Sequence, residues 1–569
     1  TIKINMKKIF NIVLMGVAVM AATSCSKLGA LSADNFKVTP TPLEANAGVV
    51  QATINGTFPE KYMKTNAVVT VTPVLKYEGG EAVAASQTFQ GEKVLGNDQT
   101  ISYKMGGNYT MRSQWQYTPE MMQSDLYLRF TAKIGNKEQE VPEVKVGYGV
   151  VSTSDLLSRT LASTNGAVAP DAFQRVIAQK QEGNIKFLIN QAQLRQSELQ
   201  STSVKDFIAM LKDINADQER LALDGIEVSA YASPDGGYAF NEKLAEKRQN
   251  TTTDYLKKQM KNIGMDNQVD AKYTAEDWDG FQQLVAASNI QDKDVILRVL
   301  SMYQDPEERE QQIHSMSSVF TELADGILPE LRRARLTINY QVIGRDDEQI
   351  LAQYKEDPKE LSLEELLYGA NMLVENNADR AAWNNTIVSL YPNDYRAYNN
   401  LASLAYANGD LAGMQSALDK AAALKGDAAE VNTNRALMAL AKGDYTTAQT
   451  YIGRGTAADS YNEVLGNLNI ATGNYAAAAS ALKDKNTNST ALAQILSKDY
   501  SSAAKTLSNI KNGDATTDYL SAILSARTND AAGVASNLTK AISKDRSYLD
   551  RAKKDLEFVQ YASTLNILK

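Results

Sequence analysis

The sequence predicts a multidomain chain with an N-terminal all-β region, a central α+β region and a C-terminal all-α region built from repeats. Three observations support this prediction. Short alternating apolar segments fill residues 33–150, a strand–turn–helix pattern occupies residues 226–248, and helical periodicity with regularly spaced turn residues runs over residues 346–569. A chain of 569 residues is long enough for about three to five domains.

Composition excludes several function classes. The chain is 43% hydrophobic and 22% charged, as in ordinary folded proteins. Its net charge of −8 gives no general attraction to nucleic acid, so we expect no nucleic-acid partner. The only histidine is His314 and the only cysteine is Cys25, which cannot together assemble a zinc cluster or a catalytic thiolate site. We therefore expect no metal, no cofactor and no enzymatic activity.

An enzyme remains an alternative through its carboxylates. Glu242 and Glu246 stand four residues apart in a helical pattern. That spacing also occurs wherever a helix face is solvated. A glycosidase needs two carboxylates across a groove, which the sequence alone does not place.

The N-terminal residues have the pattern of a signal peptide. Met6-Lys7-Lys8 is basic, residues 9–22 are mostly apolar, and small residues lead to Cys25. The apolar run is shorter than the roughly 20 residues of a membrane span. The pattern resembles a bacterial lipoprotein signal over residues 1–25, which implies that Cys25 is lipidated after cleavage. Plain secretion with an incidental cysteine is the alternative, and residues 1–5 are interpreted as upstream sequence.

The residues after Cys25 bear on the compartment. Ser26-Lys27-Leu28-Gly29 follows without an acidic cluster. In Bacteroidetes-type lipoproteins such a cluster tends to mark export to the cell surface. The resemblance thus implies an outer-membrane lipoprotein that faces the periplasm.

Residues 33–150 show the alternation of β-strands. The clearest runs are residues 50–54, 69–72 and 126–134, with Gly106-Gly107-Asn108 and Gly135-Asn136 as hairpin turns. Short strands separated by turns predict an immunoglobulin-like sandwich. Residues 151–182 are predicted to be a helical linker, from apolar residues that include Leu156, Phe173 and Val176.

The central stretch changes period at a turn. Residues 226–232 alternate as in a half-buried strand, and residues 233–237 contain proline, aspartate and two glycines. From Phe240 the apolar residues follow a helical spacing. A strand, a tight turn and a helix start can bring backbone N–H groups and an arginine to one anion.

This stretch resembles the core motif of the OmpA-like peptidoglycan-binding domain. That family has a T-D-x-x-G turn followed by N-x-x-L-S-x-x-R, and here Ala232-Ser233-Pro234-Asp235-Gly236 fills the turn while the helix supplies Asn241, Leu244, Ala245 and Arg248. Arg332-Arg333-Ala334-Arg335 resembles the start of the family's last strand. The resemblance implies an OmpA-like domain over residues 183–345, with two or three added helices between Tyr273 and Leu331.

The resemblance also implies a ligand. In the family, the helix arginine and the turn aspartate hold the carboxylate and the amine of diaminopimelate in the peptidoglycan stem peptide. Arg248 keeps the arginine position, but Ser233 replaces the aspartate: it lacks the negative charge that pairs with the amine and can accept only a weaker hydrogen bond. Asp235 and Asn241 would line the same turn. The predicted peptidoglycan-binding residues are thus Arg248, Ser233, Asp235 and Asn241.

The C-terminal region repeats itself. The recurring marks are Gly409-Asp410, Gly443-Asp444, Gly473-Asn474, Lys498-Asp499 and Asn529-Asp530. The first two are 34 residues apart, and the later steps are 30, 25 and 31. Eight residues before the Asp or Asn of each mark stands a small residue: Ala402, Ala436, Gly466, Ala491 and Ala522. The register resembles the tetratricopeptide (TPR) family, which implies a solenoid whose concave face binds envelope proteins; a plain spacer is the alternative.

Two functions follow from these expectations. In the first, the chain is a lipid-anchored cell-envelope scaffold that contacts peptidoglycan through a variant OmpA-like domain and recruits proteins through TPR-like repeats. In the second, the OmpA-like fold does not bind peptidoglycan, and the chain is a structural subunit of an envelope assembly for secretion, fimbriae or import. The role of the β-sandwich is not indicated by its sequence.

Overall fold

A computed structural model describes residues 28–290, 292–315 and 317–565. The predicted signal peptide and Cys25 lie outside the described residues. The chain divides into two compact units: residues 1–170 with residues 375–569, and residues 171–374. In the described part of the chain, no helix is both long and apolar enough to cross a membrane.

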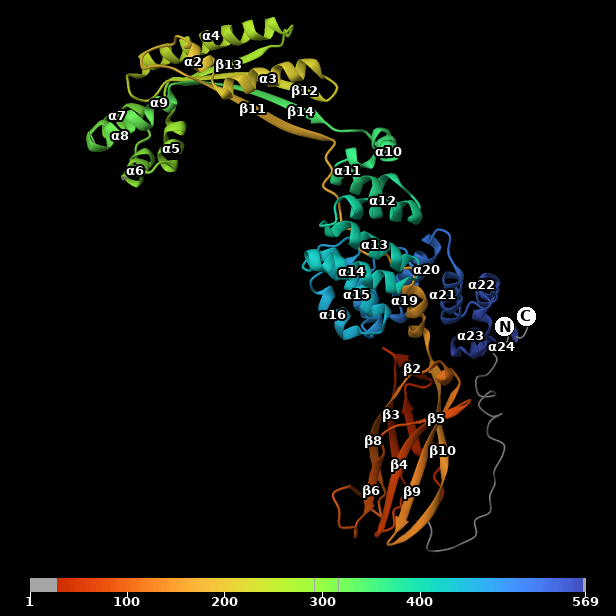
Figure 1. The fold of residues 1–569 in the computed structure, drawn as a ribbon. Helices are drawn as coiled ribbons and strands as arrows, with labels where there is room; N and C mark the ends of the chain where they lie inside the picture. Colours follow the sequence, from red (N-terminus) through yellow and green to blue (C-terminus); the bar gives the residue numbers. More distant parts are fainter. Residues whose placement is uncertain (1–27, 291, 316, 566–569) are drawn as a thin grey trace, which may run out of the picture. The chain divides into compact units, whose positions relative to one another are not determined.

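The N-terminal region is β-rich, as predicted (Figure 1). Its strands are β1 (Phe36–Thr39), β2 (Leu43–Asn46), β3 (Val49–Phe58), β4 (Ala67–Tyr77), β5 (Gly80–Val83), β6 (Gln87–Gly91), β7 (Gln99–Ile101), β8 (Gly107–Gln116), β9 (Ser124–Ile134) and β10 (Lys137–Val151). The strand order is β1-β3-β2-β10-β9-β4-β6-β7, with β5 on β4 and β8 on β3. Because β2 pairs with both β3 and β10, it joins two groups of strands.

These two groups of strands share one apolar core. Alternate side chains of β3 are buried, as its period-2 pattern predicts. Phe58 on β3 packs edge-on against Phe89 on β6, with ring centroids 5.2 Å apart. Phe36 on β1 likewise lies 6.1 Å from Phe130 on β9. Aromatic side chains from both groups of strands thus meet in this core, and the immunoglobulin-like sandwich stays a prediction.

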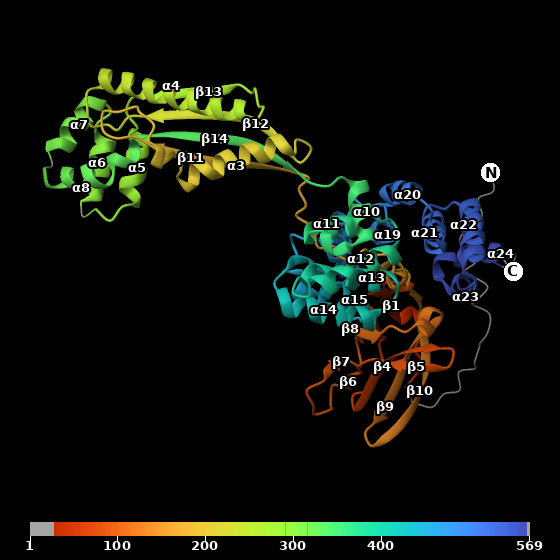
Figure 2. The ribbon, with the colours of Figure 1, turned by 45° about the horizontal axis from the view of Figure 1, so that its top comes forward.

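The C-terminal region consists of helix pairs (Figures 1 and 2). After α12 (Asn377–Leu390) the pairs are α13 (Tyr395–Ala407) with α14 (Leu411–Lys425), α15 (Ala429–Ala441) with α16 (Tyr445–Ile452), α17 (Tyr461–Ala471) with α18 (Tyr475–Ala481), α19 (Asn488–Leu496) with α20 (Tyr500–Asn509), and α21 (Ala515–Arg527) with α22 (Ala531–Lys544). The chain continues through α23 (Ser547–Lys554), η6 (Leu556–Tyr561) and α24 (Ala562–Leu565). Each predicted turn mark lies between the two helices of a pair.

The turn marks act through backbone conformation and capping. The first residue of each mark has a positive φ, which ends the first helix in the left-handed conformation: Gly409, Gly443, Gly473, Lys498 and Asn529. In four of the five marks the aspartate that follows caps the second helix; Asp410, for example, accepts a hydrogen bond from the N–H of Gly413, whereas Asn474 makes no such bond. The predicted phase of the repeats is therefore confirmed by local geometry.

The small residue of each repeat lies where the paired helices approach closely. Ala402, Ala436, Ala491 and Ala522 are fully buried. At Gly466, an added Cβ would lie 2.3 Å from Cγ of Leu482. Since that distance is far below van der Waals contact, glycine is required there by packing.

The unit of residues 171–374 contains a four-stranded sheet. Its strands, β11 (Val176–Lys186), β12 (Leu221–Tyr231), β13 (Val269–Thr274) and β14 (Arg333–Ile343), lie in the order β11-β14-β12-β13. The β12–β13 pair is parallel and the other two pairs are antiparallel. Helices α3 (Thr202–Ala216) and α4 (Tyr238–Asn262) bury their apolar sides in one core with the sheet. The α+β class is as predicted, and the OmpA-like identity stays a prediction.

A group of helices follows β13, where an insertion was predicted. These helices are α5 (Trp278–Ala287), α6 (Lys293–Met302), α7 (Pro306–Ser315), α8 (Ser317–Gly326) and α9 (Leu328–Leu331). They have a separate core that includes Trp278, Phe281 and Leu300. Among the described residues the insertion contains more helices than the two or three expected, because residues 306–331 add α7, α8 and α9 after α5 and α6.

Two predicted boundaries need correction. Residues 151–182 are helical only in η3 (Thr153–Leu156) and α1 (Leu157–Leu161), while β11 already begins at Val176 and pairs with β14 along its whole length. At the other boundary, residues 347–374 group with the central unit and not with the repeats. This stretch contains α10 (Asp347–Glu356), η4 (Pro358–Glu360), α11 (Leu363–Tyr368) and the π-helical turn η5 (Gly369–Leu373).

Candidate functional site

The predicted peptidoglycan-binding residues surround the turn between β12 and α4. Arg248, ten residues after the first residue of α4, is only 1% exposed. Its Nε donates to the carbonyl of Gln191 at 3.0 Å, Nη1 to that of Tyr231 at 2.9 Å and Nη2 to that of Leu188 at 3.2 Å. The guanidinium therefore fastens the loop of residues 188–191 to the end of β12.

Electrostatics agree with this internal role. Burial, and next the nearby Arg332 cation, lower the pKa of Arg248 to about 10, so the group stays charged at neutral pH. Its guanidinium carbon lies 5.1 Å from the ring centre of Phe187. Three carbonyl acceptors and an aromatic face replace the water that burial removes.

The other three predicted residues lie at the same turn and bind partners within the chain. The Ser233 hydroxyl donates to Asp235, and Asp235 forms a 2.9 Å ion pair with Arg332. Nδ2 of Asn241 donates to the carbonyl of Gly236 at 2.6 Å and to that of Ser233 at 3.2 Å. The four residues that the sequence singled out therefore lie together at one turn. Each of them binds a partner within the chain there. Their role in peptidoglycan binding stays a prediction.

A second candidate site lies in the repeats, where residues 162–170, which we call the strap, leave a turn at 162–163 and run without helix or strand along α13, α15 and α17. The side-chain amide of Asn434 on α15 brackets one strap residue, accepting from the N–H of Ala167 at 2.7 Å and donating to its carbonyl at 2.8 Å. Asn400 on α13 binds Ala169 in the same way: it accepts from the N–H at 2.7 Å and donates to the carbonyl at 3.4 Å. Two amides from consecutive repeats therefore hold alternate residues by their backbone.

Neighbouring side chains extend this contact. Asn399 donates to the carbonyl of Ala167 at 3.0 Å and accepts from Asn434 at 2.9 Å. On α17, Asn467 donates to the hydroxyl of Thr164 at 3.1 Å. These four asparagines are the polar lining of the site, because each is buried in a helix yet has a hydrogen-bond partner.

The site also contains one buried acid. Oε1 of Glu463 on α17 accepts from the N–H of Asn165 at 3.2 Å. Burial raises the pKa of Glu463, and the hydrogen bond from Asn165 opposes that rise. A carboxylate aimed at a backbone N–H adds a charge-assisted bond to the strap.

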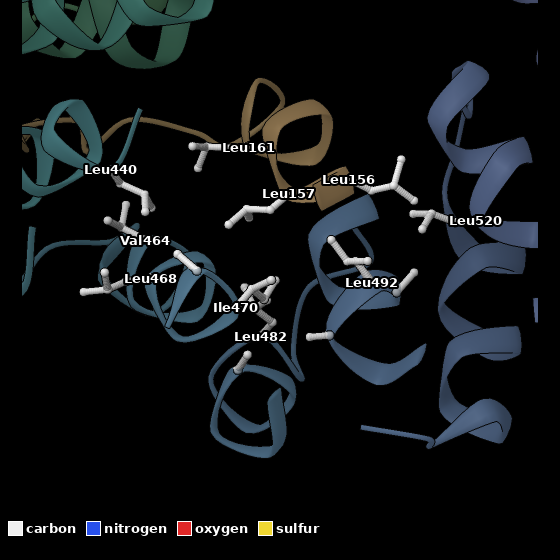
Figure 3. Packing of buried hydrophobic residues seen from close by; sticks show 14 of the residues in the cluster. Leu156, Leu157, Leu161, Leu440, Val464, Leu468, Ile470, Leu482, Leu492 and Leu520 are labelled. Atoms are coloured by element: carbon white, nitrogen blue, oxygen red, sulfur yellow. The ribbon is translucent and has the colours of Figure 1, made fainter. Parts of the chain in front are cut away.

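Apolar side chains fix the strap at its N-terminal end. Leu156, Leu157 and Leu161 are buried in the core of the repeats. Figure 3 shows them among Val464, Ile470, Leu492 and other side chains of the surrounding helices. The hydroxyl of Tyr406 donates to the carbonyl of Leu161 at 2.7 Å. The residues just before the strap are therefore fixed in the apolar core, whereas the strap itself is held mainly by hydrogen bonds.

These asparagines were not among the predicted site residues, although their positions in the repeats are related. Asn400 and Asn434 each stand two residues before the small residue of their repeat, Ala402 and Ala436. Polar residues at one buried repeat position have no reason to recur unless they face a common partner. That partner is the strap, whose placement depends on contacts more than 230 residues away in sequence.

We found no group of His, Cys, Asp and Glu side chains that could hold a metal ion among the described residues. The expectation that the chain needs no metal, cofactor or catalytic residue stays a prediction.

No protein-family model matches this sequence. Nor does any curated protein. Solved structures that it resembles include a tetratricopeptide repeat protein from Parabacteroides merdae (13% identity, 35% of this chain and 85% of that chain, TM-score 0.26). Others are PilW, described as a widely conserved type IV pilus biogenesis factor (13%, 35% and 90%, 0.26), and PilF of Pseudomonas aeruginosa (14%, 38% and 95%, 0.27).

Proposed function

We propose that this protein is a non-catalytic scaffold of the bacterial cell envelope that binds other proteins through its helical repeats. The observation that carries the proposal is the strap: the repeats hold an extended polypeptide by side chains aimed at its backbone. Helical repeats present such surfaces to partner segments. No step of this function requires a reaction.

The proposal includes a lipid anchor. The signal pattern that ends at Cys25 supports attachment to the outer membrane, facing the periplasm. One acyl group binds a membrane weakly, and stable attachment needs at least two hydrophobic signals. The proposed anchor therefore requires more than one hydrophobic chain at Cys25.

Peptidoglycan contact is the second candidate. It is favoured by the gathering of Ser233, Asp235, Asn241 and Arg248 at one turn. The same contacts weigh against it, because the guanidinium of Arg248 already serves three carbonyls and Asp235 already pairs with Arg332. We therefore favour a structural subunit of a secretion, fimbrial or import assembly over a wall tether.

Crosslinking in intact cells separates these functions. We expect the wild-type chain to form adducts with envelope proteins and none with the peptidoglycan isolated from the same crosslinked cells. The variant Cys25→Ser should be released from the membrane fraction and lose most protein adducts, because it is no longer concentrated at the membrane. Peptidoglycan adducts that depend on Arg248 would favour the wall tether, and the absence of any protein adduct would refute the scaffold.

A further inference from the structure

We propose that the groove lined by α13, α15 and α17 is an exchangeable peptide site, which takes an extended partner segment with small inward-facing residues in place of the strap. This inference rests on the proposed scaffold function and names the class of partner that the groove would hold. It follows from how the strap is recognised, which side chains fit into the groove, and how little apolar surface the strap buries.

Recognition is directed at the backbone. Asn434 and Asn400 each bind the N–H and the carbonyl of one strap residue, Ala167 and Ala169. In an extended chain, residues two apart point to the same side, so the two amides grip one edge of the segment. Every residue except proline offers this N–H and carbonyl pair. The bonds therefore require an extended chain and no particular side chain.

The space in the groove separately limits the size of the side chains that the bound segment can carry. At Gly166 an added Cβ would lie 2.6 Å from Oγ and 3.0 Å from Cα of Ser403 on α13. Ala167 and Ala169 are fully buried, whereas Val168 is only half-buried. The groove thus selects glycine or a very small residue, then small residues at alternate positions, and accepts a larger residue between them.

The strap is held mainly by hydrogen bonds. Its buried residues, Thr164, Gly166, Ala167 and Ala169, are small, and the residues at its ends are exposed, so the segment buries little apolar surface. Each of its hydrogen bonds contributes about 1 kcal/mol net. Covalent linkage gives it an effective concentration on the order of millimolar. A partner segment that offers the same backbone bonds competes with the strap, while the buried leucines at 156, 157 and 161 keep the strap's origin in place.

The test uses the full chain and a fluorescent peptide of residues 163–170, Ser-Thr-Asn-Gly-Ala-Val-Ala-Pro, with binding measured by fluorescence anisotropy. In the variant Gly166→Leu the strap no longer fits, while every groove residue is unchanged. We expect this variant to bind the peptide at least about tenfold more tightly than the wild type, because the internal competitor is removed. If Gly166→Leu does not fold, Ala167→Pro removes the strap's bracketed N–H instead.

Groove variants test whether the gain arises at the asparagines. Adding Asn434→Leu or Asn400→Leu to Gly166→Leu should weaken peptide binding about tenfold, since two backbone bonds are lost. Adding Asn462→Ala, which changes an exposed asparagine on α17, should leave it unchanged. A peptide with a methyl group on the nitrogen of Ala167 should bind at least about tenfold less well.

Three outcomes would overturn the inference. A folded Gly166→Leu chain that binds the peptide no better than the wild type would show that the groove is not exchangeable. Binding that is insensitive to both asparagine substitutions would place the peptide elsewhere. A concentration-dependent dimer formed by strap exchange would make a second copy the occupant. The scaffold function fails separately, when cells yield no protein adduct even though the purified chain binds peptide.

Discussion

At the scale of single residues, Arg248 keeps its motif position while its side chain is used inside the fold. The sequence placed this residue on the helix after the turn, because strand, turn and helix start are local in the chain. It could not show the direction of the guanidinium, since two of the carbonyls that bind it, those of Leu188 and Gln191, come from residues 60 and 57 positions earlier. Motif position is a local property, and accessibility is not.

The variant Arg248→Met tests this internal role. It keeps an apolar stem but removes the donors to three carbonyls, so we expect a loss of about 2 kcal/mol or more in the free energy of unfolding. Urea unfolding of the full chain measures this loss. The control Lys247→Met changes an exposed neighbour and should cost less than about 0.5 kcal/mol. Unchanged stability with loss of cell-wall pulldown would instead identify Arg248 as a ligand contact.

At the scale of elements, the repeats were predictable because their marks are local chemistry. A left-handed residue that ends one helix and an aspartate that starts the next define the turn without any distant contact. The stretch of residues 162–182 was not predictable in this way. Its apolar residues fit a helical spacing, but β14 supplies a pairing partner for every residue from Val176 to Lys186. Non-local pairing outweighs the local pattern there.

The turn at Lys498 departs from the glycine rule and allows a test. Lys498 has a φ of 66°, whereas Gly443 has 77° at the equivalent turn. A side chain in this conformation costs about 1 kcal/mol, partly offset by the greater freedom of glycine in the unfolded chain. We expect Lys498→Gly to stabilise the repeats by about 0.5 kcal/mol in thermal unfolding. The reciprocal variant Gly443→Lys should destabilise them by about 1 kcal/mol, and equal effects of the two variants would contradict this account.

At the scale of the whole molecule, the sequence predicted the classes of the three regions in the correct order. It did not predict that residues 375–569 group with the N-terminal part of the chain, and residues 171–374 form the other unit. The reason is the segment of η3 and α1, just before the strap, which places Leu156, Leu157 and Leu161 in the core of the repeats. Contacts of this kind join segments hundreds of residues apart and leave no periodic signal.

The division into units predicts that residues 171–374 fold alone. The first strand of this unit, β11, and its last, β14, pair from Val176 with Ile343 to Lys186 with Arg333, so the excised fragment keeps its complete sheet. We expect it to unfold cooperatively in urea, followed by circular dichroism. The fragment 183–345, cut at the boundaries that the sequence suggested, loses the β11 residues before Gly183 and should be less stable by about 2 kcal/mol or more, because their ladder bonds to β14 are lost. A 171–374 fragment that is unfolded, or no more stable than 183–345, would mean that the unit depends on the rest of the chain.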